Sequence, residues 1–93
     1  MLEKQIEKKV NDYATSKGWY VLKNDASLKK GIPDRLYIKG KLCFFIEFKT
    51  EKGKTSKVQD LRIRELREKD IRVFVINNVE DGKELINFLD YAL

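Results

Sequence analysis

The sequence predicts an α/β domain in which a mixed β-sheet is flanked by helices, in the order α-β-β-β-α-β-α. Apolar residues recur at helical spacing near both ends of the chain, and short β-branched and aromatic runs lie between them. A third helical pattern separates the last two of these runs, which implies a right-handed crossover and parallel pairing of the two strands. The 93 residues form one domain, because a chain of this length has no room for a second core.

The first helix is predicted at about residues 2–17. Its apolar residues recur at steps of three and four, which keeps them on one helical face. They are Leu2, Ile6, Val10, Tyr13 and Ala14. Gly18 follows as the stop, since glycine readily adopts the left-handed conformation after a last helical turn.

Three strands are predicted next, at residues 19–23 and at about 33–39 and 41–49. All three are rich in the aromatic and branched side chains that strands favour. The polar segment 24–31 is predicted as the loop between the first two strands. The sequence Lys39-Gly40-Lys41 is typical of a hairpin turn, so the second and third strands should pair antiparallel about Gly40.

The rest of the chain is predicted as a basic loop, a helix, a strand and a last helix. Ser56 and Gln59 match a capping box, which places the start of the helix at residue 56 and its end near 69. Residues 71–77 are predicted as a buried strand and about 80–92 as the final helix. The residues that this helix should bury are Leu85, Phe88, Leu89 and Ala92.

The composition excludes several kinds of chemistry. The chain has no histidine, which rules out Ser-His-Asp and Cys-His catalysis and zinc sites that use histidine. Its net charge of +5 favours polyanions such as nucleic acid as partners. Cys43 is the only cysteine, so no internal disulfide can form; we expect it to fill the core of an intracellular protein. No apolar stretch approaches the ~20 residues of a membrane span.

Two charged residues interrupt the most apolar run. Glu47 and Lys49 alternate on one face of the predicted strand, and the hairpin should bring Asp34 beside them. Asp34 and Glu47 are predicted to bind Mg²⁺ or Mn²⁺, with the backbone carbonyl of Phe48 as a further ligand. Lys49 would orient an attacking water and offset charge on phosphoryl oxygens. The alternative is a structural ion network of the same three side chains.

Pro33-Asp34 followed by Glu47-Phe48-Lys49 resembles the motif of the PD-(D/E)XK nuclease superfamily. Together with GIPDRL, FFIEFK, the basic loop, the Gln59 of SKVQ, and IRVFVIN, it makes nearly the whole chain similar to the VRR-NUC family in its short, stand-alone, viral-type form. The resemblance implies a restriction-endonuclease-like core and a Mg²⁺-dependent endodeoxyribonuclease that acts on branched DNA such as Holliday junctions. It also implies a homodimer, which agrees with so small a core, and, for a phage protein, a place in the host cytoplasm.

The resemblance also implies roles for individual residues. Asp34 and Glu47 match the metal-binding carboxylates, Lys49 matches the catalytic lysine, and Gln59 matches a glutamine near the active site. Gln59 has a second interpretation as the last residue of the capping box alone.

The family also uses a glutamate of the first helix, and two candidates lie one turn apart. Counting back from Gly18 favours Glu7, whereas alignment by the glutamate that opens the family's motif favours Glu3. Both stay open at this point.

Basic residues near the predicted site are expected to contact phosphates without reading base identity. They are Lys23, Lys29, Lys30, Lys52, Lys54 and Lys57. Arg35 is expected either to contact phosphate or to form an ion pair with an acidic neighbour. The main alternative to a nuclease is a catalytically silent nucleic-acid-binding module with the same fold. A protein-interaction domain with a structural ion cluster is a second alternative.

Overall fold

The computed structural model describes residues 1–24 and 28–93, so part of the predicted loop 24–31 lies outside the described residues. The elements are α1 (Glu3–Ser16), β1 (Tyr20–Lys23), β2 (Arg35–Lys39), β3 (Leu42–Phe48), α2 (Lys57–Glu68), β4 (Arg72–Ile76) and α3 (Val79–Tyr91). The predicted order and fold class are confirmed. Strand β1 begins one residue later than expected, because the Trp19 N–H donates to the Ala14 carbonyl and so belongs to the end of α1.

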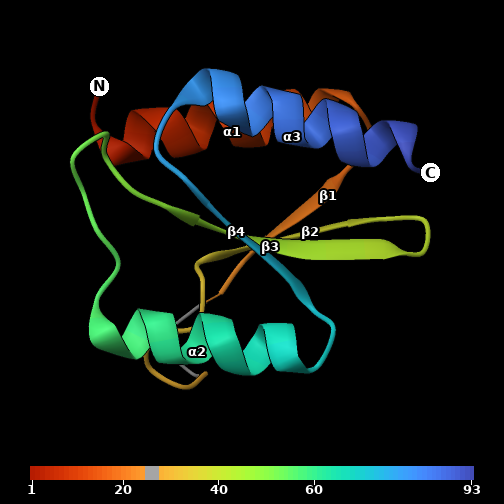
Figure 1. The fold of residues 1–93 in the computed structure, drawn as a ribbon. Coiled ribbons are helices and arrows are strands. Elements are labelled where there is room, and N and C mark those ends of the chain that lie inside the picture. Colours follow the sequence, from red (N-terminus) through yellow and green to blue (C-terminus); the bar gives the residue numbers. More distant parts are fainter. Residues whose placement is uncertain (25–27) are drawn as a thin grey trace.

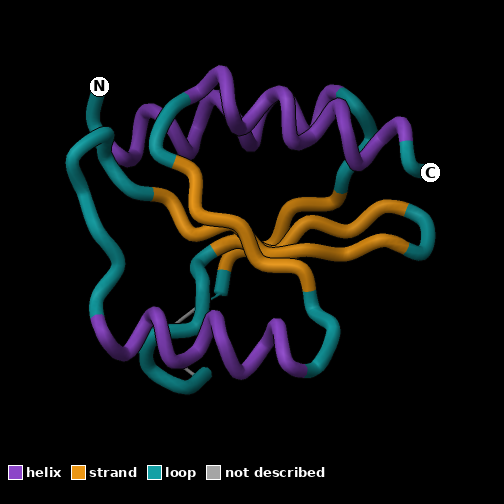
Figure 2. Tube along the Cα trace, viewed as in Figure 1, coloured by secondary structure: helices purple, strands orange, loops and turns teal. Residues whose placement is uncertain are grey.

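The described strands form one mixed sheet in the order β1-β2-β3-β4. Strand β2 pairs antiparallel with both β1 and β3, and β4 runs parallel to β3 after the α2 crossover. Gly40 forms the predicted hairpin turn with a φ of 57°. Helices α1 and α3 lie side by side on one face of the sheet, and α2 lies on the other (Figure 1). Figure 2 shows the strands crossing between these two helical layers.

The core lies between the sheet and the α1/α3 layer. Tyr37 and Phe44 of neighbouring strands stack there with ring centroids 4.9 Å apart, and both side chains are fully buried. Helix α3 approaches α1 at Gly82, where a Cβ atom would lie 2.4 Å from Cγ2 of Val10. Only a residue without a side chain permits this close approach.

The predicted buried face of the last helix is partly wrong. Leu89 is buried and Leu85 is partly buried, but Phe88 is 70% exposed and Ala92 is exposed. The helix contacts α1 through a stripe that includes Ile86, and this stripe turns Phe88 toward solvent.

Leu2, predicted as the first residue of the helix, is the N-cap residue that precedes α1 and is 69% exposed. One further burial prediction is wrong. Cys43 is exposed rather than in the core. It faces the side of the sheet that α2 covers, and α2 packs mainly against β4, away from the hairpin.

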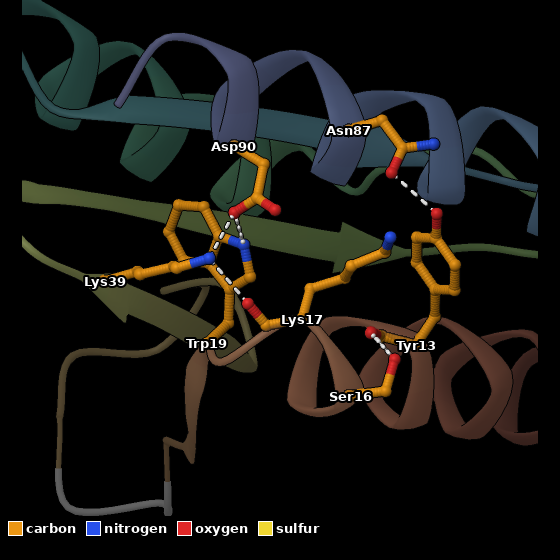
Figure 3. Close-up of polar contacts among 7 residues, drawn as sticks. All are labelled: Tyr13, Ser16, Lys17, Trp19, Lys39, Asn87 and Asp90. Atoms are coloured by element: carbon orange, nitrogen blue, oxygen red, sulfur yellow. Dashed lines mark hydrogen bonds and ion pairs between the residues drawn. The ribbon is translucent and has the colours of Figure 1, made fainter.

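A polar cluster joins α1, the hairpin and α3 (Figure 3). Asp90 Oδ1 accepts hydrogen bonds from Trp19 Nε1 at 2.9 Å and from Lys39 Nζ at 2.7 Å. The hydrogen bond from Lys39 holds the pKa of Asp90 below its ordinary value. In the same view, Tyr13 donates to Asn87 Oδ1 at 2.6 Å and links α1 to α3.

The helices described by the structure are all too short or too polar to cross a membrane.

Candidate active site

The end of β3 places a carboxylate inside the protein. Ile46 and Phe48 point into the core under α1 and α3, so strand alternation turns Glu47 toward α2 on the opposite face. Glu47 is 2% exposed, and it is the one charged residue that is buried in the described part of the chain. A buried carboxylate is costly unless a partner compensates it. The contacts of Glu47 therefore decide what it does.

Two side chains contact the Glu47 carboxylate. Lys49 Nζ lies 3.5 Å from Oε2, and Gln59 Nε2 donates to the same oxygen at 3.3 Å. The pKa of Glu47 is raised from 4.5 to about 7: burial is the largest cause, the charge of Asp34 acts in the same direction, and Lys49 acts in the opposite direction. One lysine thus compensates only part of the cost of this buried charge.

Asp34 lies directly before β2, where the hairpin register brings it close to Glu47. Arg35 pairs with Ile46, so one further step places Asp34 opposite Glu47. The Asp34 carbonyl accepts from the Asn24 N–H at 2.7 Å, which fixes the backbone here, and its side chain is exposed. The predicted meeting of these two carboxylates at the hairpin's open end agrees with this register.

This donor set fits a hard divalent cation. The charge of Asp34 raises the pKa of Glu47, and a cation between the two carboxylates would remove that repulsion. In the described part of the chain, no group of three or more His, Cys, Asp or Glu side chains is placed to hold a metal ion. Mg²⁺ is ordinarily bound by one or two carboxylates, and water and phosphate complete its shell.

Gln59 forms the predicted capping box and also contacts Glu47. Its N–H donates to Ser56 Oγ at 3.2 Å, and its Oε1 accepts from the Ser56 N–H at 2.9 Å. The predicted capping box is therefore present. The remaining amide group of the same side chain contacts Glu47, which ties the first turn of α2 to the end of β3.

The two glutamates of α1 have different neighbours. Glu7 accepts a hydrogen bond from Arg35 Nε and forms an ion pair with it, so Arg35 adopts the second of its two expected roles. Glu3, one turn earlier, is close enough to Glu47 for its charge to raise the Glu47 pKa. The structure thus distinguishes the surroundings of Glu3 from those of Glu7, which sequence spacing alone could not do.

No family model and no curated protein matches the sequence. A solved structure described as a VRR_NUC domain is similar to the chain, with a TM-score of 0.83 and 25% sequence identity. The similarity covers 91% of this chain and 94% of that chain. The chain therefore has the fold of a VRR_NUC domain, which agrees with the resemblance of its sequence to that family.

The basic residues expected to contact nucleic acid lie on loops and element ends around the end of the sheet that holds Glu47. Lys29 and Lys30 lie on a segment that packs against the start of α2: a Cβ on Gly31 would lie 2.8 Å from the Val58 carbonyl oxygen. Arg62 Nε also donates to the Lys30 carbonyl at 3.0 Å. The others are exposed at the end of β1, in the β3–α2 loop and at the start of α2: Lys23, Lys52, Lys54 and Lys57.

Sequence reasoning missed one polar face of the VRR-NUC fold. Lys4, Lys8 and Asn11 of α1 line a groove together with Lys23 and Arg35. Their spacing of four and three residues is a signal that could have identified them as one face of the helix.

Proposed function

We propose that the protein is a metal-dependent endonuclease that hydrolyses phosphodiester bonds of DNA. The observation that carries this proposal is the Glu47 carboxylate, buried at the end of β3 with Asp34, Lys49 and Gln59 around it. A buried charge that one lysine only partly compensates is poorly explained as a structural network, since an apolar residue would serve packing better. A bound cation would compensate it fully.

Asp34, Glu47 and the Phe48 carbonyl would hold Mg²⁺ or Mn²⁺. When bound, the ion polarises the scissile phosphate and lowers the pKa of a water molecule. Lys49 holds its ammonium beside Glu47 and stabilises negative charge on the phosphoryl oxygens. Gln59 fixes the orientation of the Glu47 carboxylate through its hydrogen bond.

Glu3, rather than Glu7, is proposed as the glutamate of α1 that completes the site. The Arg35 guanidinium already engages Glu7, whereas the Glu3 charge acts on Glu47. At the start of α1, Glu3 can accept a hydrogen bond from an attacking water or from a metal-bound water.

The exposed lysines around the site bind the DNA backbone in this proposal, and branched DNA such as a Holliday junction is the substrate. One such site cuts one strand, so symmetric cleavage of a four-way junction requires a homodimer. Exposed apolar side chains on and after α3 are available for pairing: Phe88, Tyr91 and Leu93 are 70%, 93% and 52% exposed. The proposed location is intracellular, and for a viral protein it is the host cytoplasm.

The test compares cleavage of a labelled four-way junction and a linear duplex by the wild-type protein in Mg²⁺, in Mn²⁺ and in EDTA. The Lys49→Ala variant should lose cleavage by about 100-fold or more. The matched control is Lys41→Ala, which removes the same charge at the hairpin turn. Junction-preferring, metal-dependent cutting supports the whole proposal, and equal cutting of both DNAs overturns the junction preference. Binding without cutting in either metal supports a catalytically silent nucleic-acid-binding module instead.

A further inference from the structure

A polar groove of about 500 Å³ lies between α1 and the neighbouring ends of β1 and β2. Lys4, Lys8 and Asn11 line it from α1, and Lys23 and Arg35 line it from the strands. Lys23 and Arg35 are paired in the β1–β2 register, so both side chains leave the sheet on the face that α1 covers. The sequence prediction assigned neither Lys4, Lys8 nor Asn11 to any site.

The groove is positively charged because its cations outnumber its carboxylates. Its two carboxylates are already neutralised: Glu7 pairs with Arg35, and Asp12 accepts from Lys8 Nζ at 2.7 Å. Within residues 1–24 and 28–93, no carboxylate forms a salt bridge with Lys4 or Lys23. A ligand with negative charge would therefore meet two ammonium groups that are not engaged by described partners.

Asn11 presents a hydrogen-bond donor to the same groove. The buried Tyr37 hydroxyl donates to Asn11 Oδ1, and burial raises the Tyr37 pKa, so this hydroxyl keeps its proton. The oxygen of the Asn11 amide is thereby held toward Tyr37. Its NH₂ group has no acceptor among the described residues and remains available to an acceptor in the groove.

We propose that this groove binds the sugar-phosphate backbone of DNA next to the bond that is cleaved, with Asn11, Lys4 and Lys23 as the contacting residues. The groove lies at the same end of the sheet as the candidate active site, since Arg35 directly follows Asp34 and Glu7 lies one helical turn after Glu3. A lining of ammonium and amide donors suits phosphate oxygens. This inference rests on the proposed function for its substrate and extends it to a second contact region.

The first experiment adds a negative charge to the groove and to a matched position elsewhere. Asn11→Asp keeps an oxygen that can accept from Tyr37, and Asn87→Asp does the same for Tyr13 on the far side of α1. Affinity for a labelled duplex and junction is measured by fluorescence anisotropy in EDTA, so that no cutting is needed. Asn11→Asp should weaken binding about tenfold, and Asn87→Asp should change it by less than about twofold.

The second experiment removes positive charge. Lys4→Ala/Lys23→Ala should lower the slope of log affinity against log salt by about 2, because each lysine neutralises one phosphate in the wild-type complex. The control Lys41→Ala/Lys69→Ala removes the same charge from the hairpin turn and from the end of α2. Circular dichroism and thermal melts confirm that each variant is folded at the assay temperature.

Four outcomes distinguish a failure of the groove proposal from a failure of the proposed function. Weaker binding and a smaller salt slope in the groove variants alone support the groove, whether or not the wild-type protein cuts. Equal binding by groove and control variants overturns the groove while leaving any observed cleavage intact. A wild-type protein that cuts but shows no salt-dependent binding also overturns the groove. If the wild-type protein neither binds nor cuts DNA, both proposals are overturned.

Discussion

Gln59 donates a hydrogen bond from Nε2 to Glu47 Oε2 at 3.3 Å, while its Oε1 accepts from the backbone N–H of Ser56 at 2.9 Å. One side chain therefore caps a helix and contacts the buried carboxylate at the end of β3. The position of Glu47 in the candidate site and the start of α2 are coupled through this residue.

Replacing Gln59 should separate the two roles. Gln59→Glu keeps an acceptor for the Ser56 N–H, and its negative charge interacts favourably with the N-terminus of α2. The free energy of unfolding should therefore stay within about 0.5 kcal/mol of the wild-type value. It also places a carboxylate beside Glu47, and cleavage should fall by about 100-fold. Gln59→Ala should lose both cleavage and about 1 kcal/mol of stability. Full activity in the glutamate variant would show that Gln59 serves the cap alone.

Stability should depend on pH through Glu47. Because burial raises its pKa to about 7, the folded protein binds the proton more tightly than the unfolded chain does. The free energy of unfolding should therefore fall as pH rises from about 4.5 to about 7, by about 3 kcal/mol, and stay level above that. Chemical denaturation at a series of pH values in EDTA measures this slope.

The variant Glu47→Gln removes the titration and serves as the control. It should be more stable than the wild-type protein at about pH 8, flat between about pH 5 and 8, and inactive. Mg²⁺ or Mn²⁺ at about pH 8 should raise the melting temperature of the wild-type protein only. An equal rise in both proteins would mean that the ion binds elsewhere.

The two glutamates of α1 should respond differently to the same change. Glu3→Gln should reduce cleavage by about 100-fold with stability nearly unchanged. Glu7→Gln leaves the partly buried Arg35 without its ion partner, so stability should fall by about 1 kcal/mol. Cleavage rates and thermal melts of both variants distinguish them. Loss of cleavage in Glu7→Gln but not in Glu3→Gln would reverse the assignment.

Substitutions at Gly82 and Val10 should have non-additive effects on the free energy of unfolding. Gly82→Ala introduces a Cβ atom that would lie 2.4 Å from Val10 Cγ2, and overpacking of this kind costs about 1–3 kcal/mol. Val10→Ala alone should also destabilise by about 1 kcal/mol, because Val10 is fully buried. The double variant should be more stable than the sum of the two single changes predicts, since the smaller residue 10 makes room. Simple additivity in urea denaturation would contradict this packing.

The local parts of the fold were predictable from sequence. The burial of a side chain was not predictable where it depends on which distant element packs over that face. Gly40 marked the hairpin turn, and the turn alone set the register that places Asp34 near Glu47. Hydrophobic periodicity predicted the helices, but it did not predict which element packs against each helical face. Phe88 and Cys43 are apolar or small, yet no described element covers them.

The candidate site shows the same division. Glu47, Lys49 and Gln59 follow from strand alternation and a capping motif, both of which are local. Glu3 and Glu7 lie on one helical face, so spacing could not choose between them. Only the docking of α1 against the sheet shows which one meets Arg35 and which one acts on Glu47.

The hairpin and the capped start of α2 bring the site together within residues 34–59, whereas Glu3 comes from the far end of the chain. Contacts between residues close in sequence form early in folding, because closing a short loop costs little entropy. We therefore expect the two carboxylates, the lysine and the glutamine to be assembled before α1 docks. The docking of α1, which brings Glu3 toward Glu47, is then the last step in making the candidate site.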